Sequence, residues 1–169
     1  MLMLVQQIVI DPEGDFVTLA DAFGHVVIDA GAYDNREIVQ LAARVREHRA
    51  SVVLALDNLE LEAQMRCAAM FLSTMFDAPR DHWYPALVVV DEAQNLEPTT
   101  LKTILTRIGE GTKVIFTGDT SQIDAPYLGE SNNALAVLIG AFRGQKCFGH
   151  ITLTSCERSE VASLAAELL

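Results

Sequence analysis

The sequence predicts an α/β protein, a three-layer sandwich around a mostly parallel sheet. Short apolar runs rich in Val and Ile alternate with segments of helical periodicity, which is the pattern of βα units. Half of the 169 residues are hydrophobic and the mean hydropathy is +0.24, as expected when both faces of a sheet are covered. We expect one domain, spanning 1–169, because a chain of this length can bury a full core.

Each expected strand is an apolar run bounded by turn residues, and the helices fall between or after these runs. Strands are expected at residues 7–10, 26–28, 51–55, 87–90, 113–117 and 149–153. Helices are expected at residues 35–49, 60–76, 99–108, 133–143 and 157–168. Asp34 or Asn35 can cap the first helix, and Ser, Thr or Asx residues precede the others.

Composition excludes several classes of protein. The formal net charge of −11 repels phosphate backbones, so contact with RNA or DNA would need a local basic groove or another subunit. Cys67, Cys147 and Cys156 form no CxxC pair, which argues against a zinc site or a disulfide framework. No apolar run reaches the roughly 18 to 20 residues of a membrane span, and the start has no basic leader. A soluble, cytoplasmic protein with no membrane partner is expected.

Acidic residues follow several of the expected strands. Asp11 comes after "IVI", Asp57 follows "VVLAL", Asp91 and Glu92 follow "LVVV", and Asp119 comes shortly after "VIFT". In an open parallel sheet the ligand crevice lies outside the carboxyl ends of the strands. We therefore expect these acids to share one rim of the sheet.

The stretch "LVVVDEAQ" carries the strongest chemical signal. Asp91 at the tip of a buried strand can position a magnesium ion, and Glu92 can orient or deprotonate an attacking water. The alternative interpretation is a strand that merely ends in acidic residues.

A second buried strand ends in "TGDTSQID". Gly118 permits a tight turn, Asp119 can hydrogen-bond to the Asp91 loop, and Gln122 can sense a terminal phosphate or its water. The alternative is an ordinary capped turn at a helix start.

A family resemblance covers residues 91–169. The motifs "DEAQN", "TRIGEGTK", "TGD..QID.PYL", "FGHITL" and "ERSE.A.LA" occur there in order. This region resembles the carboxyl half of the PhoH ATPase family, especially members that carry a PIN nuclease domain. The resemblance implies a RecA-like P-loop fold related to superfamily-one helicases, with ATP and Mg²⁺ as cofactors and, in some members, RNA unwinding or cleavage.

The resemblance also implies roles for particular residues. Asp91 and Glu92 match the Walker B pair and Gln94 the adjacent polar sensor, while the third helicase-like motif is matched by Asp119 and Gln122. Two arginines in family motifs are further candidates for contacting phosphate, including across a subunit interface: Arg107 and Arg158. Ordinary surface salt bridges are the alternative interpretation for both.

The first half, residues 7–94, resembles a different group. Its "DPEGDF" and "VVVDEAQ" segments are similar to those of HerA-type ATPases, relatives of FtsK-like DNA translocases. The two resemblances meet at residues 91–94, where related cores could be joined through a shared strand. A recombined chain and a naturally diverged ATPase are both open interpretations.

A phosphate-binding loop of the form GxxxxGK[ST] is not found in the sequence. The three lysines, Lys102, Lys113 and Lys146, do not fit that spacing. In both related families the loop precedes the region where this chain begins, so a RecA-like core without its first βα unit is expected. Such a core would bind nucleotide weakly and leave a strand edge open to homo-oligomer pairing.

Three functional hypotheses follow. The first is a PhoH-like protein that binds and hydrolyses nucleoside triphosphate, impaired by the absent loop. The second is a non-catalytic α/β scaffold or interaction module with vestigial motifs. The third, which is the weakest, is a two-metal nuclease using Asp11, Asp57, Asp91 and Asp119.

Overall fold

A computed structural model describes residues 5–120, 122–129 and 131–153. Contacts between residues divide the chain into two units, Met1–Leu138 and Ile139–Leu169, which are considered separately. The helix expected at residues 157–168 lies outside the described residues, as does Arg158.

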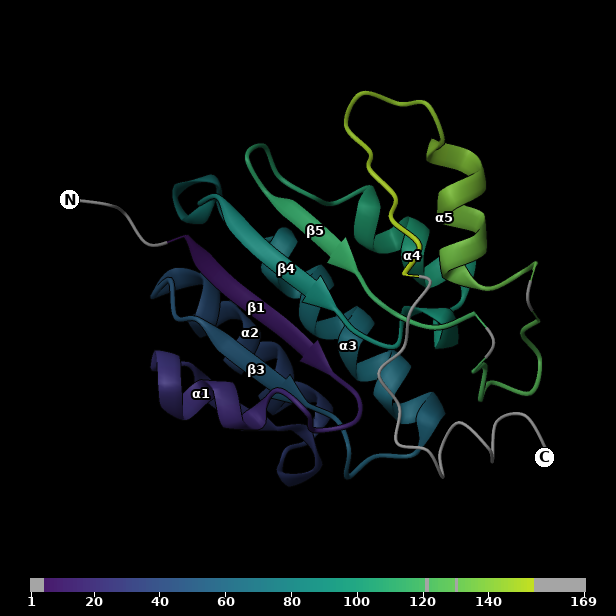
Figure 1. The fold of residues 1–169 in the computed structure, drawn as a ribbon. Helices are drawn as coiled ribbons and strands as arrows, with labels where there is room; N and C mark the ends of the chain where they lie inside the picture. Colours follow the sequence, from purple (N-terminus) through teal and green to yellow (C-terminus); the bar gives the residue numbers. More distant parts are fainter. Residues whose placement is uncertain (1–4, 121, 130, 154–169) are drawn as a thin grey trace. The chain divides into compact units, whose positions relative to one another are not determined.

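The first unit is built on a five-stranded, fully parallel sheet with the spatial order β2-β3-β1-β4-β5 (Figure 1). This confirms the α/β class and the parallel sheet. The strands are β1 Gln6–Asp11, β2 Val26–Asp29, β3 Val52–Ala55, β4 Ala86–Val90 and β5 Lys113–Phe116. They match five of the expected strands to within one residue at each end.

The helices lie on both faces of this sheet and complete three layers. The helix α1, Val17–Phe23, packs against β2 and β3 on one face. On the opposite face α3, Leu61–Phe76, packs against α2, Asn35–Glu47, and α4, Pro98–Leu105 (Figure 1). The connection from β1 to β2 runs in one direction across the sheet, and the later connections run in the other direction. Because crossovers between parallel strands are right-handed, the helix of the first connection must lie on the face opposite to the helices of the later ones.

Alternation along the strands fills both faces of the core. Ile8, Ile10, Val88 and Val90 are at most 1% exposed and face the α2–α4 layer, where α3 contributes its own buried stripe. On the α1 side, Val9 and Val53 pack with Ala20 of that helix, with Phe16 and Val89 at the margin. The strands β1 and β4 therefore lie in the interior of the sheet, where side chains pack against both of their faces.

Local signals explain the ends of the helices. Asp34 accepts from the backbone N–H groups of Arg36 and Glu37, and the Glu37 carboxylate accepts from the Asp34 N–H, which is a complete capping box. The expectation of a cap at this position is confirmed. The helix α1 was not expected; it ends at Gly24, whose φ of +72° favours glycine.

One expected strand is wrong. Residues 149–153 form no strand, and Ile151 and Leu153 are 84% and 85% exposed. An apolar run becomes a strand only when another strand accepts its hydrogen bonds, and the pattern alone does not supply one. The second unit contains the end of α5, Ala134–Phe142, and a turn in which the Phe142 and Phe148 rings lie 6.0 Å apart.

No helix within residues 5–120, 122–129 and 131–153 is both long and apolar enough to cross a bilayer.

Candidate functional site

The candidate site begins at the carboxyl end of β4, where the chain leaves the sheet. Asp91 continues the ladder through its N–H, which donates to the Ile10 carbonyl at 3.2 Å. Its half-buried carboxylate is directed towards the end of β5, where Oδ1 accepts a hydrogen bond of 2.5 Å from the Thr117 hydroxyl. Backbone bonds between Thr117 and both Val90 and Ala93 hold these two strand ends together.

The next residue, Glu92, has a left-handed backbone with φ of 51° and ψ of 36°. This region is uncommon for a residue with a side chain and concentrates at functional sites. The turn redirects the chain into the short helix Ala93–Asn95 and leaves the Glu92 side chain half-buried. Its Oε2 accepts a hydrogen bond of 2.5 Å from the Gln94 amide nitrogen.

Gln94 links the motif after β4 to the motif after β5. Its side chain is fully buried, and its Nε2 donates both to Glu92 and to the backbone carbonyl of Gln122 at 3.0 Å. Among the described residues its Oε1 has no hydrogen-bond partner, and it lies against Gly118, where any Cβ would overlap it. The structure thus places Gln94 between the loops, as a support for Glu92, and not on the exposed rim.

The loop after β5 contains the other two predicted residues. The Gln122 N–H donates to the Asp119 carbonyl at 3.0 Å, and the Gln122 side-chain amide donates to the Asp119 carboxylate at 2.9 Å. Asn95 and Asp124 exchange bonds of 2.8 and 3.2 Å, which tie this loop to the Ala93–Asn95 turn. The structure therefore brings the Glu92 and Gln122 segments together through backbone and amide contacts.

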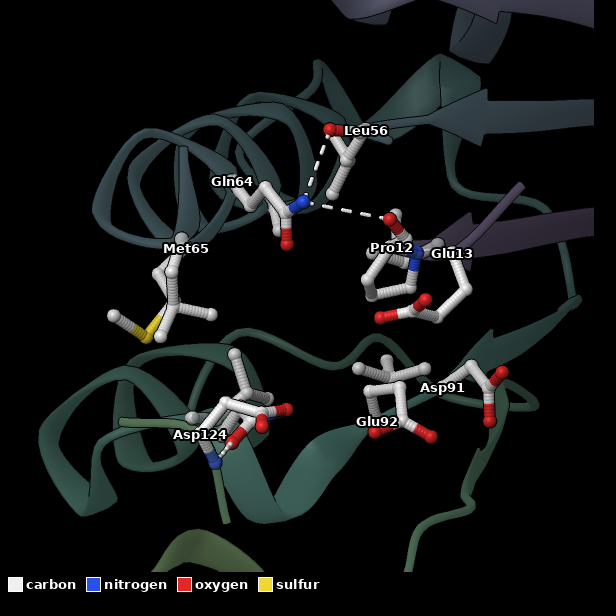
Figure 2. A pocket seen from close by; sticks show the side chains of 14 residues that line it. Pro12, Glu13, Leu56, Gln64, Met65, Asp91, Glu92 and Asp124 are labelled. Carbon is white, nitrogen blue, oxygen red and sulfur yellow. Dashed lines mark hydrogen bonds between the residues drawn. The ribbon is translucent and has the colours of Figure 1, made fainter. Parts of the chain in front are cut away.

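A cavity of about 240 Å³ opens beside Glu92, at the carboxyl ends of β1, β3 and β4 (Figure 2). The chain leaves β1 towards the α1 face and leaves β4 towards the opposite face, so the loops diverge between these neighbouring strands. Divergence of this kind marks the usual ligand crevice of an open α/β sheet. Both Asp91 and Glu92 line the cavity.

The environment raises the pKa of Glu92. Partial burial is the main cause, and the negative charges of Asp91, Glu13 and Asp124 act in the same direction. The hydrogen bond from Gln94 opposes them. A carboxylate whose pKa moves towards neutrality is better suited to accept a proton from water than an ordinary glutamate.

Two of the strand-end acids do not join this site. Asp11 is fully buried, and its carboxylate accepts from the N–H groups of Gly14, Asp15 and Phe16 at 2.9 to 3.1 Å. It caps the loop after β1. Asp57 is exposed and lies next to Gly14. Within the described part of the chain, no three His, Cys, Asp or Glu side chains gather as a metal site.

Arg107 lies just beyond the end of α4, the helix that starts near Asn95 and runs back along the sheet. Its exposed guanidinium pairs with Asp77 at 3.3 Å and donates to the Thr103 carbonyl at 3.3 Å. Asp77 follows α3, which likewise starts at the cavity and runs away from it. Within its own chain, Arg107 therefore belongs to the end of the sheet opposite Asp91.

The sequence comparisons agree with these motifs. The family model described as "PhoH-like protein" matches residues 84–168, half of the chain. The chain belongs to the PhoH-like family. It is 50% identical to Protein PhoH2 of Bacillus subtilis over 82 residues, 48% of this chain and 19% of that protein. It is 43% identical to Protein PhoH2 of Thermobispora bispora over 86 residues, 51% of this chain and 20% of that protein.

The match has clear limits. The chain is also 53% identical to the PhoH-like protein of Bacillus subtilis, but only over 51 residues, which are 30% of this chain and 16% of that protein. The chain spans about a fifth of the length of the PhoH2 relatives. No solved structure matches it significantly. The resemblance of residues 7–94 to HerA-type ATPases is not shown by these comparisons and stays a prediction.

Several residues of this PhoH-like site carry no signal in the sequence. Thr117 becomes a partner of Asp91 only because β5 pairs with β4 in this register. Glu13 reaches the cavity from the loop after β1, and Gln64 reaches it from α3 (Figure 2). Residues of these types are common on any surface, so only the fold selects them.

The donor set fits a magnesium ion better than it fits a triphosphate. Mg²⁺ is commonly held by one or two carboxylates together with waters and phosphate oxygens, and Asp91 can provide such a ligand with Thr117 beside it. A triphosphate needs N–H donors or cations. Among the described residues that line the cavity there is no lysine or arginine, and several are acidic.

Proposed function

We propose that this PhoH-like chain forms the metal and water side of a magnesium-dependent nucleoside-triphosphate site. The observation that carries the proposal is the adjacent pair Asp91 and Glu92 at the tip of β4, an interior strand, where the loops diverge around a cavity. Asp91 would hold the ion, with one carboxylate oxygen steadied by Thr117. A bound Mg²⁺ would offset the charge of the phosphates and help to orient the reacting water.

Glu92 would act on the attacking water. Its raised pKa suits proton acceptance, and the bond from Gln94 restricts the orientation of its carboxylate. Gln94 also donates to the Gln122 carbonyl, so a movement of the loop after β5 would shift the Gln94 amide and with it the Glu92 carboxylate. Asp119 and Gln122, which bind one another, are proposed as the groups through which a terminal phosphate is sensed.

Weak binding is expected from this chain alone. The sequence printed has no GxxxxGK[ST] motif, and the carboxylates near Glu92 repel phosphate oxygens. Phosphate contacts would then come from Arg158, from Arg107 of another subunit, or from additional polypeptide. Any role with RNA or DNA would depend on other subunits in the same way, because the net charge is −11. A cytoplasmic location is part of this proposal.

Calorimetry with millimolar ATP, with and without Mg²⁺, tests the proposal. We expect magnesium-dependent heat that is lost in Asp91→Asn. Asp81→Asn is the matched control, since Asp81 is exposed and lies before the opposite, amino end of β4. If the folded protein gives no heat, the second candidate function, a non-catalytic scaffold, takes its place. Glu92→Gln should retain binding but lose any turnover.

Association through the sheet edge is a further part of the proposal. Among the described strands, β5 pairs only with β4, and its Ile115 is 41% exposed. An apolar edge strand readily accepts another strand. Light scattering should show a concentration-dependent oligomer, and Ile115→Lys should shift it towards monomer; an unchanged mass for this variant would exclude the β5 edge.

A further inference from the structure

The floor of the cavity beside Glu92 is aliphatic. It is formed by side chains of β1, β4 and α3, of the residue that follows β3, and of the turn before α4: Ile10, Leu56, Leu61, Ala68, Val90 and Leu96. Met65 of α3 stands at one side of the opening (Figure 2). Such a floor favours a hydrocarbon group over a hydrated ion.

The rim offers acceptors. The carboxylates of Glu13, Glu92 and Asp124 line it, and the Asn95 amide nitrogen is already bound to Asp124. The Gln64 amide nitrogen donates to the backbone carbonyls of the surrounding loops at 3.0 to 3.4 Å. Its amide oxygen points towards the cavity (Figure 2). Along the described rim no lysine or arginine supplies a counter-charge.

The size of the cavity suits one side chain. Pockets that hold a whole small-molecule ligand occupy roughly 300 to 1,000 Å³, above the 240 Å³ found here. A second hollow of about 360 Å³ adjoins it across Met65 and is lined by Glu62, Glu97 and Tyr127, among others. Arg66 at this second hollow is exposed and pairs with Glu62 at 3.5 Å. The two hollows can therefore receive consecutive parts of one extended chain.

We propose that this cavity is a receptor for an arginine side chain presented by a basic polypeptide segment. The aliphatic stem would lie on the floor beside Met65, and the guanidinium would meet Glu13, Glu92 and Asp124. A guanidinium has five N–H donors in a planar fork, which suits several carboxylates better than the point charge of a lysine. A nucleic-acid strand is disfavoured, because its phosphates would face the same carboxylates.

Occupancy would also act on the proposed catalytic residue. A cation beside Glu92 keeps that carboxylate ionised and forms an ion pair with it. The bound segment would therefore regulate the site by occupying the carboxylate that acts on water. Only this regulatory consequence depends on the proposed function. Binding itself depends on the shape and charge of the cavity, and it can be measured without nucleotide.

The test uses the full chain with methyl-labelled methionine, followed by NMR. The probes are N-acetyl-arginine methylamide and its neutral isostere, N-acetyl-citrulline methylamide, with the Met65 resonance assigned from Met65→Leu. We expect a saturable Met65 shift with the arginine probe and affinity at least about tenfold weaker with citrulline, as when a charge-assisted bond is lost. Added salt should weaken arginine binding.

Matched variants locate the effect. Glu13→Gln combined with Asp124→Asn should weaken arginine binding about tenfold, while Glu110→Gln combined with Asp81→Asn, two exposed acids outside the cavity lining, should leave it unchanged. Equal binding of both probes would overturn the proposal. So would the absence of a saturable shift in a chain whose spectrum shows it to be folded, or a Met65 shift produced by an RNA oligonucleotide instead.

Discussion

Gly118→Ala is expected to break the link between the two motifs. The added Cβ would overlap Gln94 Oε1 and would lie 3.0 Å from Leu135 Cδ1 and 3.2 Å from the Ala93 nitrogen. Because Gln94 is fully buried, its amide has little space in which to retreat. The side chain must therefore give up its present contacts.

The cost can be assembled from these contacts. Gln94 Nε2 would lose a charged hydrogen bond of 2.5 Å to Glu92 and a neutral one of 3.0 Å to the Gln122 carbonyl. The first contributes about 1.5 to 3 kcal/mol and the second about 1 kcal/mol. Overpacking adds about 1 to 3 kcal/mol. Partial relaxation recovers some of this total, so the free energy of unfolding should fall by about 3 to 5 kcal/mol.

Urea unfolding followed by circular dichroism measures this loss. The matched control is Gly109→Ala, where an added Cβ meets no atom of the described residues within 4 Å, and its unfolding free energy should stay within about 0.5 kcal/mol of the parent. In a Gln94→Ala background the Gly118→Ala change should cost only about 1 to 2 kcal/mol, because the main overlap is gone while the strained φ of +154° and the close contacts with Leu135 and Ala93 remain. A loss below about 1 kcal/mol in the parent, or the same loss in both backgrounds, would refute the reasoning.

Three other outcomes are expected. Asp11→Asn should lower the free energy of unfolding by about 2 to 3 kcal/mol, because an amide replaces one of the oxygens that accept three loop N–H groups; an unchanged urea midpoint would contradict this. The raised pKa of Glu92 means that the folded chain holds this proton more tightly than the unfolded chain, so the parent loses stability as pH rises from about 4.5 through the folded pKa. Glu92→Gln should remove that loss, matching the parent below about pH 4.5 and exceeding it at neutral pH; parallel stability–pH curves would exclude this. Arg107→Ala should change stability by less than about 1 kcal/mol in the same urea assay, since its ion pair is exposed; a larger loss would show that the pair has a structural role.

The sequence predicted most of the sheet and the acidic motif that follows β4. Five strands appear where apolar runs predicted them, and the cap at Asp34 appears as expected, because both depend on residues close in the chain. The expected strand at residues 149–153 does not form, since pairing is a property of a neighbour and not of the run itself. The short helix α1 was detectable in principle from Gly24 following a helical pattern.

The arrangement of the site was only partly predictable. Asp91 and Glu92 were identified by their place after a buried strand. Other features depend on contacts that the sequence pattern does not reveal. These are the burial of Gln94, the capping of a loop by Asp11, and the ion pair between Arg107 and Asp77. Arg46 shows the same limit: it looks like a surface residue of α2, yet it is 3% exposed and donates to Gln6 and to the Tyr84 carbonyl at 2.7 Å.

By itself the sequence determined the layered α/β class and the PhoH-like family, and it pointed to the tip of β4 as the proposed chemical centre, since each is written in local patterns of residues. The tertiary structure alone decided which acids meet. Parallel pairing and the divergence of the loops after β1 and β4 set Glu13, Glu92 and Asp124 around an aliphatic floor, and the pairing of β4 with β5 enclosed Gln94 between the loops that follow these two strands. Neither outcome is visible in the sequence, because each arises from crossover direction and strand register, which bring together residues that lie far apart along the chain.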